Sequence, residues 1–307
     1  MALDRRLVRT LQLVATAACL ALLWRAADGG TALRHLAAAN PAWMAAAFAA
    51  LTLQTVLSAL RWRLTAARLG IALERRAALA EYYLAQLLNQ ALPGGVLGDA
   101  GRAVRARAPA GLVVSGQAVV FERLTGQIAL FAVFAGGVVV TQVVPGGFDG
   151  PSWLLAPAAL VVVAGAALLL WLAASPLPGT APLGSGAAFR HAVASPDVRV
   201  RQAWLSLGTA LCNIAAFAFC AAAIGLTLSP AAAQVLVPLI LLSMLIPITI
   251  SGWGLREGAA VALLPLAGAT GAEGLAASVA FGFTMMAAAL PGLAALALAT
   301  APDPVES

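Results

Sequence analysis

The strongest constraint on this chain is a series of apolar segments, most of them long enough to cross a membrane as a helix. We predict six full crossings, at residues 11–24, 41–60, 112–142, 153–174, 203–224 and 276–299. A crossing of hydrocarbon about 30 Å thick needs roughly 20 predominantly apolar residues. Only 10% of the residues are charged, whereas soluble domains carry about 25%. We therefore expect an all-α polytopic membrane protein, forming a single transmembrane domain over residues 1–307.

Two further apolar segments are interrupted by proline and glycine. The first, 77–92, ends at a Pro-Gly-Gly sequence, and the second, 236–246, breaks over 247–254 and then restarts as a helix. Non-helical backbone at membrane depth is tolerated only where protein buries it or where it lines a wet cavity. We therefore predict two re-entrant helical hairpins in addition to about six full spans.

The distribution of arginine predicts the orientation of these spans. All eighteen Lys and Arg positions are arginines. Fourteen of them fall in segments predicted to be cytoplasmic, including Arg61 and the loop 175–201. Arg25 and Arg34 lie in a predicted short outer connection, and Arg123 and Arg256 lie at or near membrane depth. Cytoplasmic segments of membrane proteins carry an excess of positive residues, and tryptophan often anchors the interface. We therefore predict that both termini are cytoplasmic and that Trp62 is an interfacial anchor.

An internal relation follows from this assignment. The order span, cytoplasmic hairpin, span over residues 41–142 recurs as span, outer hairpin, span over residues 203–299, with inverted orientation. Inverted repeats of this kind place a binding site near the bilayer midplane, between the two repeats. We therefore predict that the two hairpin tips face each other.

Charged residues at the hairpin tips need partners or water, because a charge at the bilayer centre costs about 2.5–3.5 kcal/mol. One interpretation is a polar cavity in which Arg256 attracts a phosphate, while Asp99 and Glu257 balance charge or contact a cationic or hydroxyl group. The other is that Arg256 and Glu257 pair with groups on the opposite hairpin and hold the tips together. The sequence alone does not separate these two interpretations.

Local sequence gives two further expectations near the first tip. Asp99 follows Gly98 and precedes a helical run, so we expect it to cap that helix. Glu122 and Arg123 are adjacent, so they do not face each other on a helix and need separate partners. Arg102 is the candidate partner of Glu122.

Three motifs in order carry a family resemblance: NQALPGGVLGDAGRAVRAR at 89–107, FERLTGQ at 121–127 and PITISGWGLREGAA at 247–260. Together they resemble the lysylphosphatidylglycerol synthase transmembrane region, also called the flippase-like domain family. The resemblance implies an integral protein of the bacterial cytoplasmic (inner) membrane, related to the part of the aminoacyl-phosphatidylglycerol synthases that moves lipid between leaflets. The full synthases carry a cytosolic aminoacyl-transferase domain after the membrane part, and this chain ends at Ser307. We therefore expect a stand-alone member that is not an enzyme.

The predicted function is transport of an anionic or glycosylated membrane lipid between leaflets, with phospholipid or glycolipid as the partner and no nucleic acid. The alternative is a non-transporting membrane partner that presents lipid to a separate glycosyl- or aminoacyl-transferase. We expect no cofactor, metal or catalytic residue. The predicted headgroup cavity comprises Asn89, Pro93, Gly94, Gly95, Gly98, Asp99, Arg102, Glu122, Arg123, Gly254, Arg256 and Glu257.

Overall fold

The fold is helical throughout the part of the chain that can be described. The computed structural model describes residues 5–92, 96–108, 110–143, 156, 160, 163, 167, 185–246 and 248–300. Within these ranges the backbone forms helices and short connections and contains no strand. The predicted all-α class is therefore confirmed.

Four helices of the described residues are long and apolar enough to cross a membrane. They are α3 (Pro41–Arg68), α6 (Leu112–Val143), α9 (Arg199–Ala223) and α12 (Gly271–Ala289) with its continuation α13 (Pro291–Thr300). A fifth candidate is bent, because α1 (Arg5–Ala26) and α2 (Gly29–Ala37) meet at 89°. All but four residues of the predicted span 153–174 lie outside the described residues. The chain is thus a multi-pass membrane protein with four or five candidate spans.

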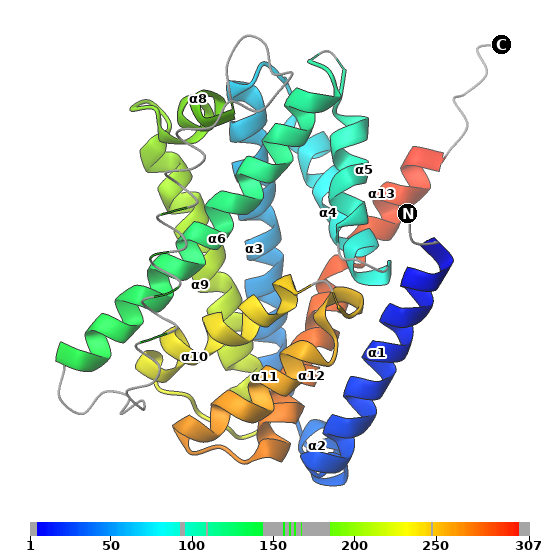
Figure 1. The fold of residues 1–307 in the computed structure, drawn as a ribbon, viewed down its shortest axis with the longest axis vertical. Helices are drawn as coiled ribbons and strands as arrows, with labels where there is room; N and C mark the ends of the chain where they lie inside the picture. Colours follow the sequence, from blue (N-terminus) through cyan, green and yellow to red (C-terminus); the bar gives the residue numbers. More distant parts are fainter. Residues whose placement is uncertain are drawn as a thin grey trace.

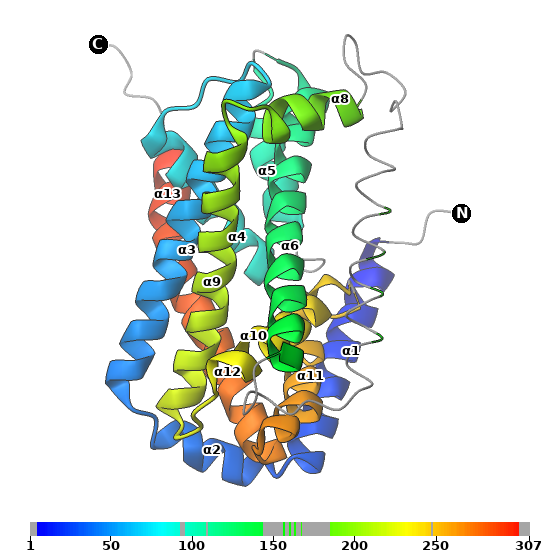
Figure 2. The same ribbon diagram turned by 90° about the vertical axis from the view of Figure 1, so that its left-hand side faces the viewer.

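The spans form a bundle with a pair of shorter helices at each end. α3 and α9 lie side by side along the long axis, and α6 packs against α9 (Figures 1 and 2). At the end where α3 finishes, α4 (Arg75–Ala91) packs against α5 (Leu97–Arg105). At the opposite end, α10 (Pro230–Leu242) packs against α11 (Leu255–Leu263). The turn between α4 and α5, at residues 93–95, lies outside the described residues.

The connection between α10 and α11 is irregular because its backbone leaves the right-handed helical region. Two 3₁₀ turns, η3 (Ser243–Leu245) and η4 (Ile250–Gly252), are followed by Gly254, whose φ is 89°. A side chain is strained at such a φ, so glycine is required there. A Cβ on Gly254 would also lie 2.6 Å from the Cβ of Cys19 on α1. Glycine at this position therefore both ends the turn and lets α1 pack against it.

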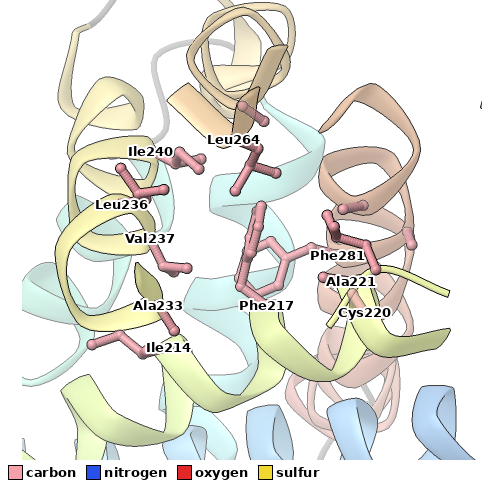
Figure 3. Packing of buried hydrophobic residues seen from close by; sticks show 14 of the residues in the cluster. Ile214, Phe217, Cys220, Ala221, Ala233, Leu236, Val237, Ile240, Leu264 and Phe281 are labelled. Atoms are coloured by element: carbon pink, nitrogen blue, oxygen red, sulfur yellow. The ribbon is translucent and has the colours of Figure 1, made fainter. Parts of the chain in front are cut away.

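The second helix pair is held to the spans by a core of interlocking apolar side chains. Phe217 of α9 and Phe281 of α12 meet with ring centroids 5.4 Å apart, and Leu236, Ile240 and Leu264 pack around them (Figure 3). Alanines in the same cluster let the helices approach closely, which is how helices associate where lipid removes the hydrophobic driving force. This packing holds α10 and the C-terminal end of α11 against α9 and α12.

Two segments predicted as loops are helical. The predicted outer connection forms α2, whose N-cap Asp28 accepts a hydrogen bond from the Thr31 amide. The described part of the predicted loop 175–201 forms α8 (Ser185–Phe189) and a π-helical turn, η2 (Arg190–Ala194). Phe189 packs edge-to-face on Phe121 of α6, so this segment belongs to the bundle. Both segments are too short to give a hydropathy signal of their own.

Candidate functional site

Five charged residues form one network inside the bundle: Arg61, Asp99, Arg102, Glu122 and Arg123. We call this set the ion network. Its centre is the fully buried Glu122 of α6, whose Oε1 accepts from Arg61 Nη2 at 2.6 Å and whose Oε2 accepts from Arg102 Nη2 at 2.7 Å. The hydroxyl of Tyr82 also donates to Oε1, at 3.2 Å. One carboxylate therefore joins α3, α4, α5 and α6, and the predicted pairing of Arg102 with Glu122 is confirmed.

Asp99 extends the network to Arg123. Its Oδ2 accepts from Arg123 Nη2 at 2.7 Å and Nε at 2.9 Å, and its Oδ1 lies 3.0 Å from Arg102 Nε. Arg102 therefore touches both carboxylates of the network. Glu122 and Arg123 have different partners, as their adjacent positions predict.

The predicted capping role of Asp99 is wrong. α5 begins at Leu97, so Asp99 is already its third residue, and its carboxylate faces arginines instead of the amides at the helix start. Asn89 does what was expected of Asp99, because its Oδ1 accepts from the Gly98 amide at 2.8 Å. The same short sequence suits a cap or an ion pair, and the outcome is decided by Arg102 of the same helix and Arg123 of α6.

Two aromatic rings enclose the guanidinium of Arg102. Its Cζ lies 4.9 Å from the Trp62 ring centroid and 4.6 Å from that of Tyr82, which are cation–π distances. Trp62 is 1% exposed and Arg61 is 3% exposed. The prediction that Trp62 is an interfacial anchor is therefore wrong, and Arg61 is buried in the bundle beside it. Hydropathy ends the span at the first charge, whereas α3 continues to Arg68 because the charge of Arg61 is paired with Glu122.

The ion network carries more positive than negative charge. It contains three guanidinium groups and two carboxylates, so its formal charge is +1. Nε and Nη1 of Arg61 and Nη1 of Arg102 have no hydrogen-bond partner among the described residues. The side chain of Arg123 is 46% exposed, whereas that of Arg102 is fully buried. The network is therefore closed around Arg102 and accessible at Arg123.

A second polar group, which we call the ion pair, consists of Arg256 and Glu257 at the start of α11. Both side chains are fully buried, and Arg256 Nη2 donates to Glu257 Oε1 at 2.5 Å. Glu257 Oε2 accepts from the Gly254 amide at 2.6 Å, and Ser278 of α12 bonds to both charged groups. The interpretation that Arg256 and Glu257 pair with the opposite hairpin is wrong. Glu257 instead reaches back to the helix N-cap, which brings its carboxylate against the neighbouring arginine.

The charge of Arg256 is balanced by Glu257, and its guanidinium is enclosed by aromatic rings. Its guanidinium lies 4.9 Å from the ring centroid of Trp253 and 5.5 Å from that of Phe281. A Cβ on Gly282 would lie 2.4 Å from Arg256 Nη2, so only glycine leaves room for this side chain. The ion pair has a formal charge of zero, in contrast to the ion network.

A comparison of the sequence with protein-family models identifies its family. The model for the lysylphosphatidylglycerol synthase TM region matches residues 9–292, which include both polar groups. The chain belongs to this family. No curated protein matches the chain.

In this member of the lysylphosphatidylglycerol synthase TM family, α12 contacts both the ion pair and α4. Ser278 of α12 binds the ion pair, and about two turns further along, the carbonyl of Met285 accepts from Gln90 of α4 at 2.9 Å. α4 also contacts η4, the turn that precedes α11. The end of the first helix pair therefore lies against the break in the second.

The remaining predicted site residues are glycines and a proline. Gly98 permits a close approach, because a Cβ there would lie 1.9 Å from the carbonyl oxygen of Ala85 on α4. Pro93, Gly94 and Gly95 lie outside the described residues. Sequence reasoning missed Arg61, Trp62, Tyr82, Ser278 and Gly282. The only signal that could have found Arg61 is the need of a buried carboxylate for enough positive partners.

Titratable side chains capable of binding a metal are dispersed. Among the described residues no group of three or more His, Cys, Asp or Glu side chains could hold a metal ion. The arrangement described here is instead suited to binding a charged group through guanidinium hydrogen bonds, which match phosphate and carboxylate oxygens in a bidentate manner.

Proposed function

We propose that this protein moves an anionic or glycosylated lipid between the leaflets of the bacterial cytoplasmic membrane. The observation that carries the proposal is the ion network, with its surplus positive charge and its accessible Arg123. Arg123 is the twelfth residue of the 32-residue apolar helix α6, so the proposed membrane-spanning position of this helix places Arg123 within the bilayer. Exposed arginine at that depth needs water or an anion. Membership of the lysylphosphatidylglycerol synthase TM family supports a role in lipid transport or modification.

We propose that α4–α5 and α10–α11 are re-entrant hairpins and that the segment around 153–174 supplies a sixth span. The arrangement of the elements supports this topology. The helix pair α4–α5 lies at one end of the bundle and α10–α11 at the other, and α3 and α9, the first spans of the proposed repeats, run in opposite directions (Figure 1). Residues 41–142 and 203–299 would then form the two halves of an inverted repeat.

The proposed orientation places the end that carries α5 and α8 in the cytoplasm. The C-terminal ends of α3 and α5 and the start of α9 carry arginines and lie at this end (Figures 1 and 2). An excess of arginine marks cytoplasmic segments. In this orientation the first hairpin opens toward the inner leaflet and the second toward the outer leaflet.

In the proposed cycle a lipid headgroup enters between the hairpins while the acyl chains stay in the bilayer. The ion network supplies positive charge and hydrogen-bond donors to the headgroup, and the ion pair fixes the start of α11. The polar interior replaces water around the headgroup during the crossing, which lowers the cost of moving it through hydrocarbon.

Reconstituted vesicles test the proposal directly. A headgroup-labelled phosphatidylglycerol is placed in both leaflets, and a membrane-impermeant quencher is added outside. If the protein moves lipid, the quenched fraction rises well above the outer-leaflet share. An Arg34→Gln variant, changed on exposed α2, should behave as the unmodified protein. Equal quenching with and without protein would exclude transport of this lipid, and retained lipid binding in the same preparation would then favour a lipid-presenting partner of a separate transferase.

A further inference from the structure

We infer that a water molecule is bound inside the bundle between α3, α6 and α9, where it accepts hydrogen bonds from Arg61 and donates to Gln202 and Ser206. The inference goes beyond the proposed function, because it holds whether or not the protein moves lipid. It gives the ion network a neutral ligand and adds α9 to the helices that the network connects.

The register of α3 against α9 carries the first step. Gln202 Nε2 of α9 donates to Thr65 Oγ1 of α3 at 2.9 Å. The two helices pack side by side in opposite directions (Figure 1). One turn away from this contact, α9 therefore presents Ser206 where α3 presents Arg61. Residues four positions apart lie on the same face of a helix, so Ser206 and Arg61 face the same interior space.

Two glycine contacts agree with this placement. Further along the same helices, a Cβ on Gly208 of α9 would lie 3.1 Å from Cδ1 of Leu57 on α3. On α6, a Cβ on Gly126 would lie 2.9 Å from Arg61 Nη2 and 3.3 Å from Arg61 Nη1. The guanidinium of Arg61 therefore lies against the backbone of α6, at the level where α9 presents Ser206.

Unpaired polar atoms carry the second step. Nε and Nη1 of Arg61, Oε1 of Gln202 and Oγ of Ser206 are buried and have no hydrogen-bond partner among the described residues. The orientation of the Gln202 amide follows from its other contact, because Nε2 also lies 3.3 Å from the carbonyl of Ala192, which can only accept. The unpaired atom of Gln202 is therefore an acceptor, whereas those of Arg61 are donors.

The chemistry of these four atoms suits water. A water molecule accepts two hydrogen bonds and donates two, and buried waters typically make about three, to polar groups that the protein leaves unpaired. A cation would be repelled by the Arg61 guanidinium, and an anion would be repelled by the carbonyl oxygen of Gln202. The charge of Arg61 is already met by Glu122 at 2.6 Å, so the site needs no charged ligand.

The bound water extends the ion network toward η2. Gln202 binds the carbonyl of Ala192, which belongs to this π-helical turn. Hydrogen bonds would then run without interruption from Glu122 through Arg61, the water and Gln202 to η2. The interior end of the network and the docking of η2 would therefore share one water.

A structure of the full-length chain in a lipid nanodisc, at a resolution that shows ordered water, tests the site directly. We expect an isolated density peak about 2.7–3.2 Å from Arg61 and from Gln202 or Ser206. Density continuous with a side chain from elsewhere in the chain would overturn the inference, and so would the absence of any peak.

A double-mutant cycle tests the same site in solution through the unfolding temperature. Ser206→Ala should lower this temperature by a few degrees, because the water loses an acceptor. In an Arg61→Lys background the same change should have little further effect, since lysine keeps the charge beside Glu122 but lacks the separate Nε and Nη1 donors. Side chains that make no direct hydrogen bond should be coupled in this way only through the water between them.

The matched control is Thr209→Val in the same two backgrounds. The Thr209 hydroxyl donates to the Leu205 carbonyl of its own helix, so its effect should add to that of Arg61→Lys. Additive effects for Ser206 would overturn the inference, and so would coupling of Thr209 as strong as that of Ser206. If Arg61→Lys does not fold, the density decides. Neither measurement uses lipid transfer, so a protein that holds the water but moves no lipid would reject the proposed function alone.

Discussion

At the residue scale the central side chain of the ion network is Glu122. Its two carboxylate oxygens accept hydrogen bonds from Arg61, Arg102 and Tyr82, which lie on three different helices. A buried charge of this kind adds little net stability, because desolvation offsets the Coulomb attraction, but removing one partner is costly. The main consequence of removing the Glu122 carboxylate would therefore be two buried guanidinium groups, those of Arg61 and Arg102, without their shared counter-charge.

Replacing Glu122 by Gln should lower the free energy of unfolding by about 3–5 kcal/mol, since Arg61 and Arg102 would remain buried without their counter-charge. Denaturation of the purified protein by sodium dodecyl sulfate, followed by circular dichroism, measures this change. Glu81→Gln is the control, because Glu81 pairs with Arg105 where both side chains are partly exposed. Such a pair contributes about 0–1 kcal/mol. Equal losses in the two variants would contradict the central role of Glu122.

The residues of the ion network also show how far sequence reasoning reaches. Adjacency on a helix separates Glu122 from Arg123, and the need for a partner points to Arg102, so this pairing is predictable. Arg61 is not predictable in the same way. Hydropathy treats a charge at the end of an apolar run as the membrane boundary, and only the tertiary position of Glu122 shows that the helix continues inward.

At the element scale the first hairpin depends on how closely α5 approaches α4. Gly98 lies against the backbone of Ala85, and the Gly98 amide donates to Asn89. These contacts set the position of α5 and hence of Asp99 and Arg102, which the same helix carries toward α6. The geometry of the ion network is thus a consequence of a glycine contact outside it.

Gly98→Ala should displace α5 and weaken the ion network, because the added Cβ would lie 1.9 Å from the Ala85 carbonyl oxygen. We expect lower thermal stability and reduced lipid transfer in vesicles. Gly101→Ala on the same helix is the control, since its Cβ would meet only the flexible end of Arg105, at 3.0 Å. A Gly98→Ala protein that matches the Gly101→Ala protein in both measurements would show that the close approach is not needed.

For the helix pair α10–α11, the corresponding prediction concerns Gly282 of α12, which lies against Arg256. Gly282→Ala should push Arg256 out of the space between Trp253 and Phe281, because a Cβ would lie 2.4 Å from Arg256 Nη2. The expected result is a lower unfolding temperature, measured by the scattering and fluorescence of a thermal ramp. The control is Gly136→Ala on α6, where an added Cβ meets nothing within 4 Å. An unchanged unfolding temperature for Gly282→Ala would mean that the ion pair does not stabilise this region.

Among the features of individual elements, the positions at which helices break are well predicted by the sequence. Proline and glycine between apolar runs predict that helices end near residues 92 and 246, and α4 and α10 end at Ala91 and Leu242. Short helices are harder to predict. α2 and α8 have nine and five residues, and they are stabilised by a local cap and by Phe121, respectively, instead of by a long apolar face.

At the scale of the whole molecule the two helix pairs are similar in placement but different in charge. The pair at one end contributes to an accessible network with a surplus charge, and the pair at the other end carries a closed, neutral ion pair. Two equivalent tips would bind an anion equally from either side. Under the proposed function, this difference assigns the anionic headgroup to the end with the ion network, so the orientation of the molecule would decide which leaflet that headgroup meets first.

Orientation is therefore the decisive prediction at this scale. Ala194 and Ala38 are exposed residues at opposite ends of the bundle, in η2 and directly after α2. In intact cells a membrane-impermeant thiol reagent should label Ala38→Cys and spare Ala194→Cys, because the arginine-rich end is expected to be cytoplasmic. After the cells are permeabilised both variants should react, and the unmodified protein measures the background from Cys19, Cys212 and Cys220. Labelling of Ala194→Cys alone in intact cells would reverse the orientation and place the ion network on the side of the outer leaflet.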